Sequence, residues 1–114
     1  MADCIFCKIR DGVIHGDIIH QDERAVVFRD INPQAPLHAV IIPRDHIPTL
    51  NDLRPEHNEL VGHLFQVAAK VAKDAGYGDT GYRTLFNCGA HAGQTVFHIH
   101  LHVLAGRHLG WPPG

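Results

Sequence analysis

Charge of one sign, cysteine and long hydrophobic runs are all scarce in this sequence of 114 residues. The formal net charge is -2 and no block of like charge occurs. This excludes the basic stripe of a protein that binds polymeric nucleic acid and the polybasic segment of a membrane-surface protein. No apolar run approaches the roughly eighteen residues of a membrane span, and the first residues do not resemble a signal peptide. We therefore expect a cytoplasmic protein that contacts neither a membrane nor polymeric nucleic acid.

Cysteine occurs only three times, as Cys4, Cys7 and Cys88. An odd number in a reducing compartment argues against a disulfide framework and favours free thiols or metal ligands. Cys4 and Cys7 form a CxxC pair, which by itself is compatible with a redox motif, a metal site or chance. The pair alone does not decide between these.

The hydrophobic content of 45% suits one domain over residues 1–114. Apolar residues recur at steps of three and four between 55 and 75, which predicts one long amphipathic helix with Asn51 or Asp52 as its N-cap and Gly76 at its end. Residues 4–10 allow one or two helical turns. Short apolar runs predict strands at 18–20, 25–29, 38–42, 82–87 and 96–104. This pattern indicates an α+β protein with an antiparallel sheet.

The last of these runs contains His98, His100 and His102, which alternate with apolar residues. In an extended strand this period of two places the three imidazoles on one face and the apolar side chains on the other. Alternate residues lie about 6.6 Å apart, so the row is too spread for one metal ion to collect all three rings without distortion. The row favours a site for a phosphate-sized group; incidental histidines on a half-exposed strand are the alternative.

A short turn precedes the histidine row. Gly93 allows a tight backbone turn whose N–H groups could point at an anion, and the Thr95 hydroxyl adds a donor. Most such turns only connect strands, but this one delivers donors to the head of a row of imidazoles. His100, at the centre of the row, is placed to attack phosphorus and form a covalent phosphohistidine-type intermediate that water then resolves.

These residues resemble a known family. The segment from His98 to His102 matches the His-x-His-x-His motif that names the histidine-triad (HIT) family. Segments 30–38, 42–46, 92–97 and 111–114 resemble its Hint branch, so the resemblance covers essentially the whole chain. It implies a HIT-like fold with a five-stranded antiparallel sheet, one long helix and a short N-terminal helix, assembled as a homodimer.

The resemblance also implies an activity. The Hint branch contains purine nucleoside phosphoramidases, which cleave the P–N bond of adenosine or guanosine 5′-phosphoramidates and release an amine and AMP or GMP. Carried onto this sequence, His100 is the nucleophile that becomes nucleotidylated. The resemblance gives the remaining nucleotide contacts to His102, Asn87, Gly93, Gln94 and Thr95 at the phosphate, to Asp30 at the ribose, to Ile31 and Phe28 at the nucleoside, and to Trp111 of the tail.

Other residues take supporting roles in the resemblance. His38 matches a histidine behind the triad that orients the nucleophile or shares a proton with it; a strand histidine satisfied by a backbone carbonyl is the alternative. Ile5, Phe6 and Ile9 are candidates for the base pocket, with ordinary core packing as the alternative. Some relatives hold a structural zinc ion with ligands that correspond here to Cys4, Cys7, His46 and His98. Catalysis in this family requires no cofactor.

Two other functions remain open at this stage. The chain could be a nucleotide-binding or scaffolding module with little turnover, because intact His100 and Thr95 make catalysis possible without showing that it is used. It could also hydrolyse dinucleoside polyphosphates or transfer nucleotides, as other branches of the superfamily do. The transferases carry glutamine at the position of His102, and the Trp-Pro-Pro-Gly ending is not expected in the polyphosphate hydrolases.

Overall fold

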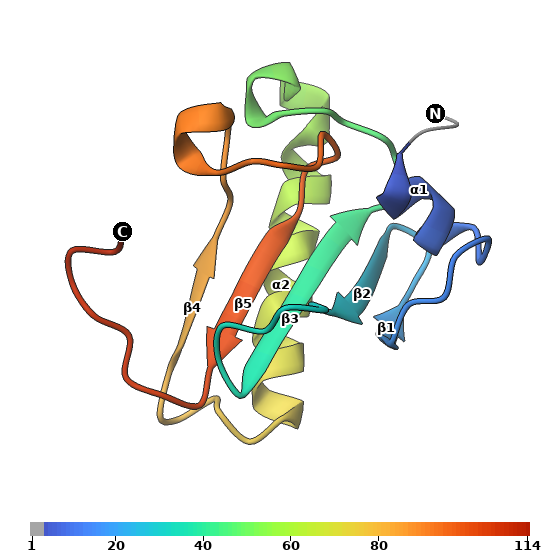
Figure 1. Ribbon diagram of the computed structural model, residues 1–114. Helices are drawn as coiled ribbons and strands as arrows, with labels where there is room; N and C mark the ends of the chain where they lie inside the picture. The colour runs from blue at the N-terminus through green and yellow to red at the C-terminus, as the bar shows by residue number, and fades with distance from the viewer. Residues whose placement is uncertain (1–3) are drawn as a thin grey trace.

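The computed structural model describes residues 4–114. Their five strands form one antiparallel sheet with the strand order β1-β2-β3-β5-β4 (Figure 1). The strands are β1 (Ile18–Gln21), β2 (Ala25–Arg29), β3 (Leu37–Pro43), β4 (Tyr82–Leu85) and β5 (Leu101–Ala105). A short helix α1 (Ile5–Arg10) precedes the sheet, and a long helix α2 (Asn58–Asp74) lies between β3 and β4 in sequence. The predicted α+β class, with five antiparallel strands, one long helix and a short N-terminal helix, is confirmed.

Helix α2 follows the predicted apolar period, but its start differs from the prediction. A 3-10 turn at Pro55–His57 precedes the helix, which begins at Asn58. The predicted caps are wrong, because Asn51 and Asp52 belong to a separate 3-10 turn that Thr49 caps. At the other end Gly76 follows the helix with φ +92°, as the prediction of a glycine stop requires.

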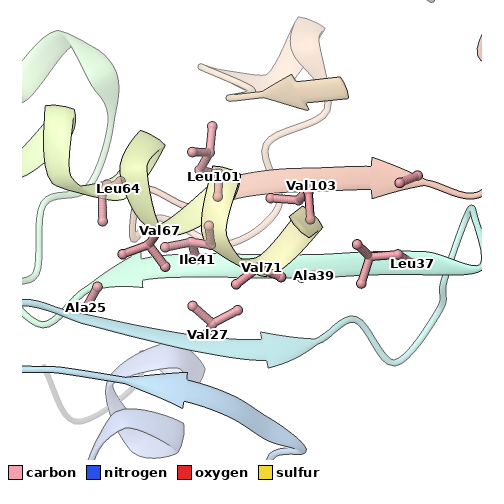
Figure 2. Close-up of a cluster of buried hydrophobic side chains, with 13 residues drawn as sticks. Ala25, Val27, Leu37, Ala39, Ile41, Leu64, Val67, Val71, Leu101 and Val103 are labelled. Atoms are coloured by element: carbon pink, nitrogen blue, oxygen red, sulfur yellow. The ribbon is translucent and has the colours of Figure 1, made fainter. Parts of the chain in front are cut away.

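The main core lies between α2 and one face of the sheet (Figure 2). Alternate residues of β3 and β5 point toward the helix, so that Ile41 and Leu101 are fully buried beneath it. Leu64 of the helix is also fully buried and belongs to the same cluster, in which the close-up labels it. Because successive strand residues face opposite sides, the intervening positions of the same strands are free to build a second face.

The second face of the sheet carries a smaller apolar cluster. Ile9 of α1 packs there with Val26 and Phe28 of β2 and with Val40 and Ile42 of β3. The two helices therefore cover opposite faces of the sheet. His38 of β3 and His102 of β5 lie on the face that α1 covers. Among the described residues, no helix is both long and apolar enough to cross a bilayer.

The turn between β1 and β2 is organised by one carboxylate. Asp22 accepts hydrogen bonds from the backbone N–H groups of Arg24 and Ala25, at 2.8 and 2.9 Å, and lies 3.1 Å from His20 Nε2 and 2.8 Å from His63 Nε2. Burial alone would raise the pKa of Asp22, but these hydrogen bonds together hold it well below its usual range. The turn is thereby tied to α2 through His63.

Two strands are shorter than predicted. The strand expected at 82–87 ends at Leu85, and the one expected at 96–104 is regular only from Leu101 onward. The backbone before Leu101 leaves the sheet because its partner is a loop: the Ile99 N–H donates to the Ile47 carbonyl at 2.8 Å. The three histidines therefore do not form one regular row, and each has a different set of neighbours.

Candidate active site

A cavity of about 690 Å³ opens on the face of the sheet that carries α1. One wall comes from α1 and the loop after it, and the other comes from β2, β3, β5 and the loop before β5. Eleven of the predicted site residues line this cavity: Ile5, Phe6, Ile9, Phe28, Asp30, Ile31, Asn87, Gly93, Thr95, His100 and His102. Side chains that are far apart in sequence therefore converge on one space, large enough for a small ligand.

The ring of His100 is oriented by its own backbone segment. His100 Nδ1 lies 2.8 Å from the His98 carbonyl oxygen. Because a carbonyl can only accept, Nδ1 carries the proton and Nε2 keeps its lone pair. The ring is buried, and burial is the main cause that lowers the pKa of His100 below its ordinary value. The site thus holds a neutral imidazole whose free nitrogen is available for attack on an electrophile.

The tautomer of His102 is set from outside the cavity. The Gln34 backbone N–H donates to His38 Nδ1 at 3.0 Å, so the proton of neutral His38 is on Nε2. His38 Nε2 lies 2.8 Å from His102 Nδ1, and this contact makes Nδ1 of His102 the acceptor. His102 therefore carries its proton on Nε2. Burial lowers the pKa of His102 to about 4, which keeps the ring neutral near pH 7.

Asp30 adds a carboxylate at the same end of the cavity. Its Oδ1 accepts the Asn32 backbone N–H at 2.8 Å, and its Oδ2 lies 3.5 Å from His38 Nε2. Ile31 beside it is fully exposed at the rim. Behind them, Phe6 and Phe28 meet edge to face with ring centroids 5.2 Å apart. The cavity is therefore polar where histidines and Asp30 meet and apolar where Phe6 and Phe28 meet.

The loop before β5 holds its shape through Gln94. The Gln94 side chain is buried; its oxygen accepts the Gly89 N–H at 2.9 Å, and its nitrogen donates to the carbonyls of Pro48 and Val96. Gln94 does not line the cavity. Gly93 does, at φ +91°, a conformation that favours glycine. Of the residues in the predicted phosphate turn, Gly93 and Thr95 line the cavity, whereas Gln94 holds the loop in shape.

Two other predicted site residues lie outside the cavity. His38 lies behind the cavity wall, where its Nε2 contacts two lining residues, His102 at 2.8 Å and Asp30 at 3.5 Å. Trp111 is 83% exposed, and the tail that carries it is held near β4 by a hydrogen bond from Arg83 to the Gly110 carbonyl. Sequence reasoning missed several lining residues of the loop after α1: Ile14, His15, Gly16 and Asp17. No motif marks them: the loop is held against the helix by backbone hydrogen bonds to the Lys8 carbonyl, and Gly16 packs closely against Ile9.

Four side chains next to the cavity could hold a metal ion. The predicted ligands Cys4, Cys7, His46 and His98 have their donor atoms within 4.8 Å of one another. The Cys4 and Cys7 sulfurs lie 3.4 and 3.5 Å from His98 Nδ1, and the Cys7 sulfur lies 3.3 Å from His46 Nδ1. Zn–S bonds of about 2.3 Å and Zn–N bonds of about 2.0 Å at tetrahedral angles place sulfur and nitrogen about 3.5 Å apart. The spacing of these donors therefore fits zinc.

His98, one of the two histidines of this cluster, has the orientation that a metal ligand needs. His98 is fully buried, and its Nε2 lies 2.8 Å from the Pro43 carbonyl, so Nε2 carries the proton and Nδ1 faces the sulfurs with a free lone pair. Burial lowers the pKa of His98 to about 4, which keeps the ring neutral. Two thiols and two imidazoles leave no open coordination position, which is typical of a structural rather than a catalytic zinc site.

Fold and site together define a small α+β protein whose central cavity is lined by paired, neutral histidines. A family described as "Scavenger mRNA decapping enzyme C-term binding" matches residues 3–110. The sequence is 48% identical to an Escherichia coli protein named purine nucleoside phosphoramidase, over 95% of this chain and 91% of that one. It is 47% identical to an uncharacterized HIT-like protein of Synechocystis, over 98% of this chain and 97% of that one.

Solved structures agree with these sequence relatives. A HIT family hydrolase from Legionella pneumophila superimposes with a TM-score of 0.97 at 46% identity, covering 98% of this chain and 100% of that one. A histidine triad protein from Clostridium difficile superimposes with a TM-score of 0.93 at 41% identity, covering 96% of both chains. The chain is a member of the histidine-triad family, as its motifs predict.

Proposed function

We propose that this protein is a hydrolase that cleaves the P–N bond of adenosine and guanosine 5′-phosphoramidates. The observation that carries the proposal is the pair of fixed tautomers, which leaves a lone pair on His100 Nε2 and a proton on His102 Nε2. One ring can attack phosphorus while the other donates to a phosphoryl oxygen. The name of the Escherichia coli relative supports the same bond specificity.

The reaction runs in two displacements. His100 Nε2 attacks phosphorus, the P–N bond to the leaving group breaks, and the amine takes up a proton as it departs. Water then attacks phosphorus, the bond to His100 breaks, and the released nucleoside monophosphate carries the oxygen of that water. The proton that water gives up balances the one that the amine took. His102 stabilises the charge that develops on the phosphoryl oxygens in both steps.

The remaining residues bind the nucleotide. Asp30 accepts hydrogen bonds from vicinal ribose hydroxyls, while Phe28, Ile31 and the side chains of α1 contact the purine base. Asn87, Gly93 and Thr95 lie on the phosphate side, where the Thr95 hydroxyl is near the leaving group. Such a division suits a nucleoside monophosphate, which is apolar and flat at the base and charged at the phosphate.

Substitution of His100 tests the proposal. We expect His100→Asn to bind AMP with an affinity near that of wild type and to hydrolyse an adenosine 5′-phosphoramidate at least about 1,000-fold more slowly, because the nucleophile is gone. Mass spectrometry of wild type quenched during turnover should detect one nucleotidyl group on His100. Unchanged hydrolysis by the variant would refute the mechanism. Equal, negligible rates for both proteins would favour a binding module.

Zinc at Cys4, Cys7, His46 and His98 is a separate proposal, supported by the spacing of the donors. When bound, zinc would tie α1 to the loop after β3 and to His98. Metal analysis of protein purified without a metal-affinity tag should find about one equivalent of zinc. Less than a tenth of an equivalent would reject the assignment.

We also propose that the protein is a homodimer that joins two sheets at β4. Within residues 4–114, β4 pairs only with β5, so its other edge is open, and Phe65 and Tyr82 are exposed to 43% and 38%. An open edge with aromatic neighbours favours association with a second copy. This arrangement brings the tail with Trp111 toward the partner's cavity. Sedimentation equilibrium should give twice the mass of one chain, and a monomer at micromolar concentration would contradict the proposal.

A further inference from the structure

One wall of the cavity is formed by a very short helix and the loop that follows it. Ile5, Phe6 and Ile9 of α1 line the cavity, and so does the loop from Ile14 to Asp17. This loop is fastened to the helix, since Val13 and Ile14 donate backbone hydrogen bonds to the Lys8 carbonyl, at 2.9 and 3.3 Å. Asp17 at the end of this loop is tied separately to β2, because the Arg29 N–H donates to its carbonyl at 3.0 Å. The α1 part of the wall is positioned by whatever holds the helix in place.

Helix α1 has few means of staying in place on its own. It contains six residues, far fewer than the roughly 12–15 that an isolated helix needs to be even marginally stable in water. Apart from apolar packing by Phe6 and Ile9, its side-chain contacts with the body of the protein are the thiol contacts to His46 and His98 and a hydrogen bond from Arg10 to the Arg44 carbonyl. Among the residues that the structure describes, the four metal-ligating side chains are therefore, with the Arg10 hydrogen bond, the polar anchors of the helix.

The same four side chains are next to the groups that would contact a nucleotide. Phe6 lies between the two cysteines, and its ring meets the His100 ring edge to face, with centroids 4.9 Å apart and an interplanar angle of 85°. His98 contacts both sulfurs through Nδ1, and its carbonyl accepts the Nδ1 proton of His100. Two separate paths therefore run from the metal ligands to the His100 ring, one through a side chain and one through the backbone.

We propose that zinc at Cys4, Cys7, His46 and His98 and a nucleotide in the cavity increase each other's affinity, with Phe6 as the positioning residue that couples the two sites. The inference rests on the nucleotide binding proposed above. Binding of zinc fixes the Cys4–Cys7 turn, and the turn fixes Phe6 against His100. A nucleotide then meets a wall already in place and loses less affinity to the ordering of α1. By thermodynamic reciprocity, a bound nucleotide strengthens zinc binding by the same factor.

The test is a pair of binding titrations with AMP and Zn²⁺ as probes. The dissociation constant of AMP is measured by calorimetry on zinc-loaded protein and on chelator-treated protein, and the zinc dissociation constant is measured against a competing chromophoric chelator with and without saturating AMP. We expect both constants to improve by the same factor, about fivefold or more, which is the usual size of an allosteric coupling. Neither readout depends on turnover.

Variants locate the coupling. Phe6→Ala should keep one equivalent of zinc and reduce the coupling factor toward one, and Cys7→Ser should bind AMP as chelated wild type does, with no response to zinc. Val13→Ala is the matched control. Val13 lies in the loop that follows α1, is 72% exposed and does not line the cavity. This variant should therefore keep the full coupling factor.

Each of the other outcomes refutes the inference. Equal, measurable AMP affinities with and without zinc refute the coupling and leave the proposed function standing. AMP that binds neither form refutes both. A Phe6→Ala variant with the wild-type coupling factor refutes the path through Phe6. If chelation abolishes the far-UV circular dichroism spectrum of the folded protein, zinc acts on global folding, and the local mechanism is wrong.

Discussion

His38 offers the sharpest test of how the site sets its proton positions. The ring is 7% exposed and makes two hydrogen bonds in series, from the Gln34 N–H to Nδ1 at 3.0 Å and from Nε2 to His102 Nδ1 at 2.8 Å. If His38 is replaced by alanine, His102 loses the partner that keeps its proton on Nε2. The ring can then protonate at Nδ1 instead, and it no longer donates to the phosphoryl oxygen.

The size of the effect follows from the bonds that are lost. Two hydrogen bonds weaken, the one between His38 and His102 and the one between His102 and the phosphoryl oxygen, by about 1 kcal/mol each. A sum of about 2 kcal/mol in the transition state corresponds to a roughly 30-fold fall in kcat. We expect His38→Gln to recover most of this loss, because its amide nitrogen can still donate to His102 Nδ1.

The assay is steady-state hydrolysis of an adenosine 5′-phosphoramidate by wild type, His38→Ala and His38→Gln, with urea unfolding of each protein as the control for folding. A purely structural role would lower activity and stability together, and glutamine would not restore the rate selectively. The reasoning is refuted if alanine and glutamine variants both stay within about twofold of wild type. It is equally refuted if a folded glutamine variant is as slow as the alanine variant.

Three further predictions concern stability. Leu64→Ala removes a fully buried side chain between α2 and the sheet and should lower the free energy of unfolding by about 3–4 kcal/mol, seen as a lower urea midpoint at constant m; a loss below about 1 kcal/mol would contradict the assigned core. Asp22→Asn keeps one acceptor oxygen but places an amide group against His20 and His63. We expect the free energy of unfolding to fall by about 1–2 kcal/mol, which lowers the thermal midpoint by several degrees. An unchanged midpoint would show that the turn is not held by this carboxylate. Acid should destabilise the protein through His102: burial lowers its pKa to about 4, so between pH 6.5 and pH 4 the unfolded chain binds more protons than the folded one. The contribution of His102 to the free energy of unfolding should therefore fall by on the order of 1–2 kcal/mol as pH drops through that window, and the other buried histidines add to the same slope. Urea unfolding of chelated protein measures this, and His102→Asn should show a shallower dependence; equal slopes would assign the effect to other groups.

The spacing of apolar residues in the sequence was enough to predict elements that bury only one of their faces, such as helix α2. The apolar period of α2 follows from its one contact surface, and the glycine at 76 ends the helix as expected. The strand expected at 96–104 shows the limit of this reasoning. Alternation of histidine and apolar residues is the same in a strand and in the extended segment before Leu101, and only the hydrogen bond between Ile99 and Ile47, 52 positions apart, decides between them.

The site divides in a similar way. Motif resemblance located the residues that line the polar half of the cavity, such as Asp30, Asn87 and His102. It did not show that the Gln94 side chain makes its hydrogen bonds to nearby backbone groups and not to a ligand. Nor did it show that the chain after α1 folds back to line the cavity beside the helix. These facts depend on backbone contacts between distant segments, such as the Pro48 carbonyl that accepts from Gln94, and carbonyl groups are the same in every residue.

The two faces of the sheet assign different tasks to neighbouring residues. Along β3, Leu37, Ala39 and Ile41 meet helix α2, whereas His38 and Val40 between them point toward the cavity side. Changes in ligand preference and changes in thermal tolerance therefore fall on alternate positions of one strand. A lineage, or a directed-evolution experiment, can alter the first without disturbing the second, as long as substitutions keep to a spacing of two.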